Sequence, residues 1–97
     1  LPVVVSSAVE TSVGLEAGLR LAAALPELPF ACGLETGRLL SRDVTAQPLL
    51  PVGGDLEVRS IVVGSGALSA CRADAATERW WLDRLRRVAA IAGVGMP

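Results

Sequence analysis

Residues 1–14, LPVVVSSAVETSVG, decide the fold of this chain. Their short apolar, β-branched run is typical of a strand buried on both faces. It ends in Ser6 and Ser7, and Ser7 with Glu10 has the spacing of a capping box; the alternative helix caps are Thr11 and Ser12. A strand that leads into a helix N-terminus builds a site for a carboxylate or phosphate, because unpaired N–H groups and the positive end of the helix dipole meet there.

The next thirty residues predict a strand–helix–strand unit. Residues 13–25 are rich in alanine and leucine, and the expected core face of this helix comprises Val13, Ala17, Leu21, Ala24 and Leu25. Pro26 ends the helix, and 28–32 is a second short apolar run that stops at Gly33. The crossover should be right-handed and the strands parallel. Ser6 and Ser7 should then lie beside residues 32–34, about 4.8 Å away, at the edge where α/β folds bind ligands.

The remaining sequence is less regular. We expect one helical turn over 36–40, an irregular segment over 43–48 and a turn over 51–55. Residues 56–59 alternate as a half-exposed strand does, and 64–66 form a break of small residues. An amphipathic helix is predicted from Asp74 or Ala75 to about Ala92, with an inward face of Trp81, Leu82, Leu85, Val88 and Ala89.

Composition narrows the functions that the chain can perform. It has 97 residues, enough for one small domain at most, and all nine basic residues are arginines. Without lysine or histidine, it lacks an imidazole base and a Schiff-base amine. Acidic residues share the last helix with arginines, which argues against nucleic acid. No apolar stretch is long enough to span a membrane, and no basic segment precedes the apolar start, so we expect a cytoplasmic protein. Cys32 and Cys71 are expected to be buried, reduced thiols.

Residues 2–14 resemble the seventh barrel strand of actinobacterial o-succinylbenzoate synthases, a family of the enolase superfamily. Residues 21–36 agree, because Gly33-Leu34-Glu35-Thr36 is similar to the G-L-x-T end of the family's eighth strand. Residues 43–49 resemble the segment that leaves the barrel for the capping domain. The likeness is close over residues 1–50 and loose afterwards, and Glu35 departs from the small residue or aspartate often found in the motif.

The resemblance implies an α/β fold: the last βαβ unit (strands 7 and 8) of a (β/α)8 barrel over residues 1–50. Residues 51–97 would be a tail that packs on the capping domain and ends in a helix. Such enzymes are lyases of menaquinone biosynthesis that dehydrate 2-succinyl-6-hydroxy-2,4-cyclohexadiene-1-carboxylate to 2-succinylbenzoate. Their two lysines and the three carboxylates that hold Mg²⁺ lie on strands two to six. The chain therefore resembles a carboxyl-terminal fragment that carries no catalytic residue and no metal ligand, and we expect it to be inactive and unstable alone.

What remains is the positioning of a small carboxylate substrate. The candidate contacts to its succinyl carboxylate are Ser6, Ser7, Thr11, Ser12, Gly33 and Leu34. Two alternatives stay open: an N-succinyl amino acid racemase of the same superfamily, and a small anion-binding module without enzymatic activity. In a purely structural interpretation, the hydroxyls of Ser6 and Ser7 only cap the helix and bind no ligand.

Overall fold

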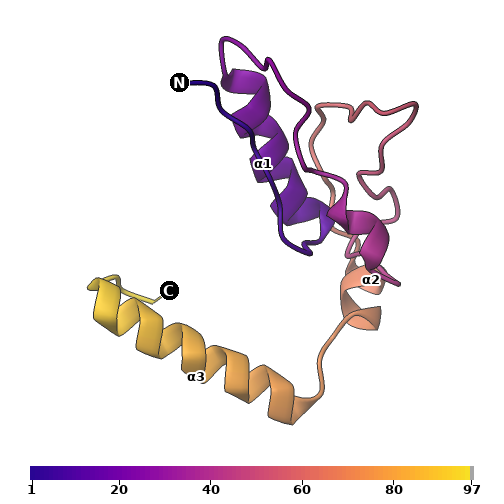
Figure 1. The fold of residues 1–97 in the computed structure, drawn as a ribbon. Helices are drawn as coiled ribbons and strands as arrows, with labels where there is room; N and C mark the ends of the chain where they lie inside the picture. Colours follow the sequence, from indigo (N-terminus) through magenta and orange to yellow (C-terminus); the bar gives the residue numbers. More distant parts are fainter. Residues whose placement is uncertain (97) are drawn as a thin grey trace.

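A computed structural model describes residues 1–96 and contains three α-helices and one short 3-10 helix (Figure 1). Helix α1 spans Ser12–Ala24, η1 Thr36–Leu39, α2 Ser65–Ala70 and α3 Ala75–Ala92. The predicted helices over 13–25 and 75–92 and the predicted turn over 36–40 are confirmed within a residue. Helix α2 was not predicted; it occupies the expected break of small residues and begins after Gly64.

The two predicted strands are parallel, but they form one bridge rather than a sheet. Ser6 pairs with Gly33, the Ser7 amide donates to the Gly33 carbonyl at 2.9 Å, and the Gly33 amide donates to the Val5 carbonyl at 2.9 Å. The prediction of full strands buried on both faces is wrong for this chain: Val5 is buried, but Val3, Val4 and Phe30 are exposed. A pair of strands without further neighbours has little ladder to form.

The core lies between α1, the two extended segments and the chain after η1. It comprises Val5, Leu15, Leu19, Ala22, Leu34 and Leu49. The expected core face of α1 is wrong, because Val13 and Leu21 are exposed whereas Leu15 and Leu19 are buried. Both faces of this alanine- and leucine-rich helix are apolar, so periodicity could not choose between them.

Contacts from distant residues hold the second half of the chain against α1. The Ile61 amide donates to the Glu16 carboxylate at 2.8 Å, and Arg20 pairs with the same carboxylate. The Ile61 N–H, followed by Arg20, lowers the pKa of Glu16. Gly53 and Gly54 make the predicted turn with positive φ angles of 62° and 92°, where glycine has no Cβ to clash. No strand forms over the predicted 56–59 within the described chain.

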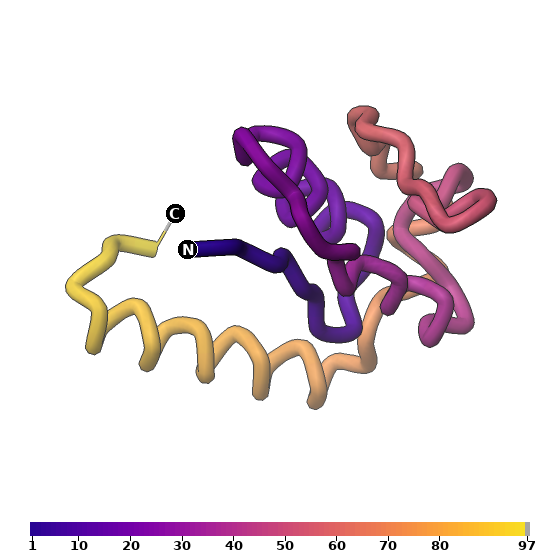
Figure 2. The backbone as a smooth tube through the Cα atoms, turned by 45° about the horizontal axis from the view of Figure 1, so that its top comes forward, coloured from indigo at the N-terminus to yellow at the C-terminus, as the bar shows by residue number. Residues whose placement is uncertain are grey.

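Helix α3 stands apart from α1 in both views of the backbone (Figures 1 and 2). The Asp74 carboxylate caps it by accepting from the Ala76 and Thr77 amides at 2.9 Å, and Gly93 ends it in a left-handed conformation. Of the predicted inward face only Ala89 is buried; the exposed residues are Trp81, Leu82, Leu85 and Val88. Nothing in residues 1–96 covers that face, so the helix forms from local capping and propensity alone.

The molecule is more open than a complete domain of its size. Its accessible surface is 7176 Å² for 10.0 kDa, whereas a folded monomer of that mass has about 5,200 Å². Its radius of gyration is 15.7 Å, against about 12.5 Å expected for a compact chain of this length. In keeping with this openness, neither cysteine is buried as predicted: Cys32 is half-buried and Cys71 is exposed. Within residues 1–96, no helix combines the length and the apolar character that spanning a membrane requires.

Candidate functional site

The predicted edge, where Ser6 and Ser7 lie beside Gly33, is present in the structure and faces solvent; we call it the rim. Ser6 and Gly33 lie opposite each other on parallel segments, and both are exposed. A Cβ added to Gly33 would lie 3.0 Å from the Ser6 Oγ, tighter than ordinary contact. Gly33 therefore leaves room for the Ser6 hydroxyl, which makes no side-chain hydrogen bond within residues 1–96. This hydroxyl is consequently free to donate to a ligand at the rim.

The Ser7 hydroxyl, in contrast, is directed into the protein. Its Oγ lies 2.8 Å from the Thr36 Oγ1 and 3.2 Å from the Gly33 carbonyl oxygen. The Thr36 hydroxyl donates its one proton to the Ala8 carbonyl. Since a hydroxyl has a single proton, Ser7 must donate to Thr36 or to Gly33. The Ser7 hydroxyl can therefore accept a hydrogen bond from a ligand but cannot donate one.

The loop between Ser7 and α1 does not contain the predicted capping box. The Ser7 hydroxyl is engaged with Thr36 instead, and the Glu10 carboxylate accepts from the Ala8 amide at 3.1 Å. Thr11 is the N-cap residue, but its side chain makes no capping bond. No hydrogen bond of the described chain uses the amides of residues 9–11, so these N–H groups point to no internal acceptor.

The hydrogen-bond donors at the start of α1 are paired with a residue that was not among the predicted site residues. The Asp43 carboxylate accepts from the Ser12 amide at 3.0 and 3.2 Å and from the Ser12 hydroxyl at 2.6 Å. The Ser12 Oγ in turn accepts from the Leu49 amide at 2.8 Å, and Ser12 is fully buried. The predicted role of Ser12 at an open helix terminus is therefore not available in this structure.

Leu34, the last of the predicted contact residues, has its side chain in the core, whereas its backbone follows Gly33 at the rim. Leu34 is 4 % exposed, and its side chain belongs to the apolar core. A contact from Leu34 to a ligand would have to come from its backbone. In sum, the structure brings Ser6, Ser7 and Gly33 together, keeps Thr11 at the end of the same loop, and turns the side chains of Ser12 and Leu34 inward.

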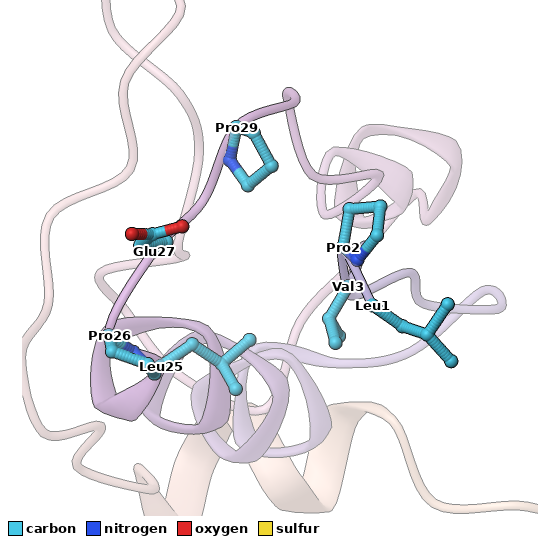
Figure 3. Close-up of a pocket in the computed structure, with 7 residues that line it drawn as sticks. All are labelled: Leu1, Pro2, Val3, Leu25, Pro26, Glu27 and Pro29. Carbon is cyan, nitrogen blue, oxygen red and sulfur yellow. The ribbon is translucent and has the colours of Figure 1, made fainter.

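Leu34 and Asp43 each line a surface hollow, but the other main hollows of residues 1–96 lie away from the rim. One of about 370 Å³ is at the opposite ends of the two extended segments, between residues 1–3 and the region from Leu25 to Pro29 (Figure 3). Glu27 is its one ionisable side chain, and apolar or proline side chains form the remainder. No group of three or more His, Cys, Asp or Glu residues within 1–96 is arranged to hold a metal ion. The described residues do not fit a Mg²⁺ site.

Comparison with known proteins finds similarity over most of the chain but over a small part of each relative. The chain is 61% identical over 85 residues to the o-succinylbenzoate synthase of Thermobifida fusca, which covers 88% of the chain and 26% of the relative. It is 51% identical over 86 residues to that of Mycobacterium leprae, covering 89% and 25%, and 46% identical over 86 residues to that of Mycobacterium marinum, covering 89% and 26%. No family model matches.

The chain thus spans about a quarter of the length of the curated relatives it matches. The resemblance expected from residues 1–50 is confirmed, and it extends further than expected, because 85 aligned residues must reach well into the tail. These proportions are consistent with a carboxyl-terminal fragment of the synthase.

Proposed function

We propose that this chain is the carboxyl-terminal portion of an o-succinylbenzoate synthase. In that enzyme it would help to dehydrate 2-succinyl-6-hydroxy-2,4-cyclohexadiene-1-carboxylate to 2-succinylbenzoate, a step of menaquinone biosynthesis. The observation that carries the proposal is the 61% identity to a protein of that name, over 88% of the chain. The parallel pairing of Ser6 with Gly33 supports it, because that pairing is what two neighbouring strands of a barrel require.

The proposed task of this portion is to hold the succinyl carboxylate of the substrate. Ser6 donates a hydrogen bond from the exposed rim, and the amides of residues 9–11 add further donors from the adjoining loop. Each charge-assisted hydrogen bond contributes on the order of 1.5 to 3 kcal/mol. Ser7 shapes the loop through Thr36 and Gly33 rather than donating to the substrate. Binding energy from this remote carboxylate orients the reacting ring.

The chemical step belongs to residues outside this chain. Lysines for proton transfer and carboxylates for a divalent metal are expected in the preceding part of the enzyme, and the described residues offer neither. The proposed partners of this chain are therefore the rest of the barrel and a capping domain.

The exposed surface supports such partners. The chain presents about 1,900 Å² more surface than a compact monomer of its mass, and one side of a standard protein interface buries about 800 Å². The exposed surface includes many large apolar side chains. On α3 it includes Trp81, Leu85 and Val88, each more than half exposed. A face of this size and character is typical of a segment that packs against the remainder of one enzyme.

The proposal is tested by measuring turnover with the intact protein, which is encoded by the reading frame that contains this chain. We expect conversion of the cyclohexadiene carboxylate to 2-succinylbenzoate, followed by the absorbance of the aromatic product. A matched assay measures racemisation of an N-succinyl amino acid. Racemisation without dehydration would contradict the synthase assignment and favour the N-succinyl amino acid racemase. The absence of both activities, with anion binding by the 97 residues alone, would favour the small binding module.

A further inference from the structure

The N-terminus of α1 is occupied by a carboxylate of the chain itself. Both oxygens of Asp43 accept from the Ser12 amide, one also accepts from the Ser12 hydroxyl at 2.6 Å, and the other from the Val44 amide at 2.7 Å. Within residues 1–96 no arginine forms an ion pair with Asp43. Its charge is stabilised by N–H and O–H donors and by the positive end of the helix dipole.

This contact fixes one end of the loop that adjoins the rim. The loop, residues 7–11, is held at its start by the hydrogen bond from the Ser7 amide to the Gly33 carbonyl and by the hydroxyl of Thr36. At its end, Asp43 holds Ser12, the residue that follows the loop, and Ser12 also accepts from the buried Leu49. Two anchors on five residues determine where the amides of residues 9–11 point.

We propose that Asp43 is a positioning residue for the carboxylate-binding loop. This inference rests on the proposed synthase function and goes beyond it in two respects. Asp43 occupies the helix terminus that an incoming anion would otherwise use, so the succinyl carboxylate is received by Ser6 and the loop amides instead. Asp43 also sets the geometry of those amides without touching the substrate.

The test uses Asp43→Asn in the intact protein. Asparagine keeps one acceptor oxygen that can still accept from Ser12, but it places an NH2 donor where the other oxygen accepts from the Val44 amide, and it removes the negative charge at the start of α1. We expect KM for the cyclohexadiene carboxylate to rise on the order of tenfold, with a smaller change in kcat. Inhibition by 2-succinylbenzoate should weaken by a similar factor, whereas inhibition by benzoate, which lacks the succinyl group, should stay within about twofold. Asp55→Asn is the matched control, because Asp55 is exposed and its carboxylate makes no hydrogen bond within the described chain.

A merely structural role would lower Tm and leave KM and both inhibition constants unchanged, and that result would overturn the inference while the synthase function stood. If Asp43→Asn does not fold, Ser12→Ala removes the hydroxyl from the same contact and should shift KM and 2-succinylbenzoate inhibition in the same direction. An unchanged KM in Ser12→Ala would then overturn the inference. If the unmodified intact protein fails to convert the cyclohexadiene carboxylate, the proposed function fails, and this inference fails with it.

Discussion

The substitution Thr36→Val tests how the rim is held in place. Valine has nearly the shape of threonine but lacks the hydroxyl that donates to Ala8 and lies 2.8 Å from the Ser7 Oγ. Without it, the loop over residues 7–11 loses a tie to η1, and Ser7 retains one acceptor, the Gly33 carbonyl at 3.2 Å.

The expected magnitude follows from these contacts. Two hydrogen bonds between neutral groups are lost, and each has a net contribution of about 0.5 to 1.5 kcal/mol. Ala8 is exposed, so water replaces the donor to its carbonyl and the lower part of that range applies there. The total is about 1 to 2 kcal/mol of interaction that holds the loop in place, so the decrease in kcat/KM should be at most roughly 5- to 30-fold, the value reached when all of that loss appears as mispositioning of the rim.

Steady-state turnover of the intact protein measures the change. Thr36→Ser is the matched control, because serine keeps the hydroxyl, and it should stay within about threefold of the unmodified protein. A Thr36→Val protein as active as Thr36→Ser would refute the role assigned to this hydroxyl.

Three further predictions concern the rim, the last helix and the chain alone. Gly33→Ala places a methyl group 3.0 Å from the Ser6 Oγ and should lower kcat/KM several-fold. Gly66→Ala is the control and should leave kcat/KM unchanged, because a Cβ at Gly66 would meet nothing within 4 Å. Equal kinetics for the two variants would contradict the close approach at the rim. The N–H of Thr77, then its hydroxyl, then the Ala76 N–H lower the pKa of Asp74, so this cap stabilises α3 above the ordinary Asp pKa of about 3.9 and is lost as pH falls through the lowered value. The 97-residue chain should therefore lose more of its ellipticity at 222 nm on acidification than the Asp74→Asn variant does. Superimposable titrations of the two proteins would show that the carboxylate does not cap α3. The isolated chain should melt without a cooperative transition and show no turnover, because its buried core contains few side chains; a sharp two-state melt of a monomer would count against a fragment.

Sequence patterns predicted what local interactions determine. Helices α1 and α3 and the turn at Gly53 follow from alanine and leucine content, from the Asp74 cap and from glycines in positive-φ positions. The parallel register of Ser6 and Gly33 followed from the strand–helix–strand order.

Long-range contacts could not be predicted in this way. Asp43 reaches Ser12 across 31 residues, and only the structure shows that Thr11, the N-cap residue of α1, makes no side-chain capping bond. The core face of α1 and the full strands also escaped prediction. Two faces of the helix are apolar, one with Leu15 and Leu19 and one with Val13 and Leu21, and strands gain their ladders from neighbours that these residues do not include.

The DNA immediately upstream of the codon for Leu1 tests most directly whether these 97 residues work as one part of a larger catalyst. We predict that the open frame continues upstream and encodes a K-x-K sequence followed by spaced Asp, Glu and Asp residues. A native start codon adjacent to Leu1, with no such sequence before it, would contradict the assignment.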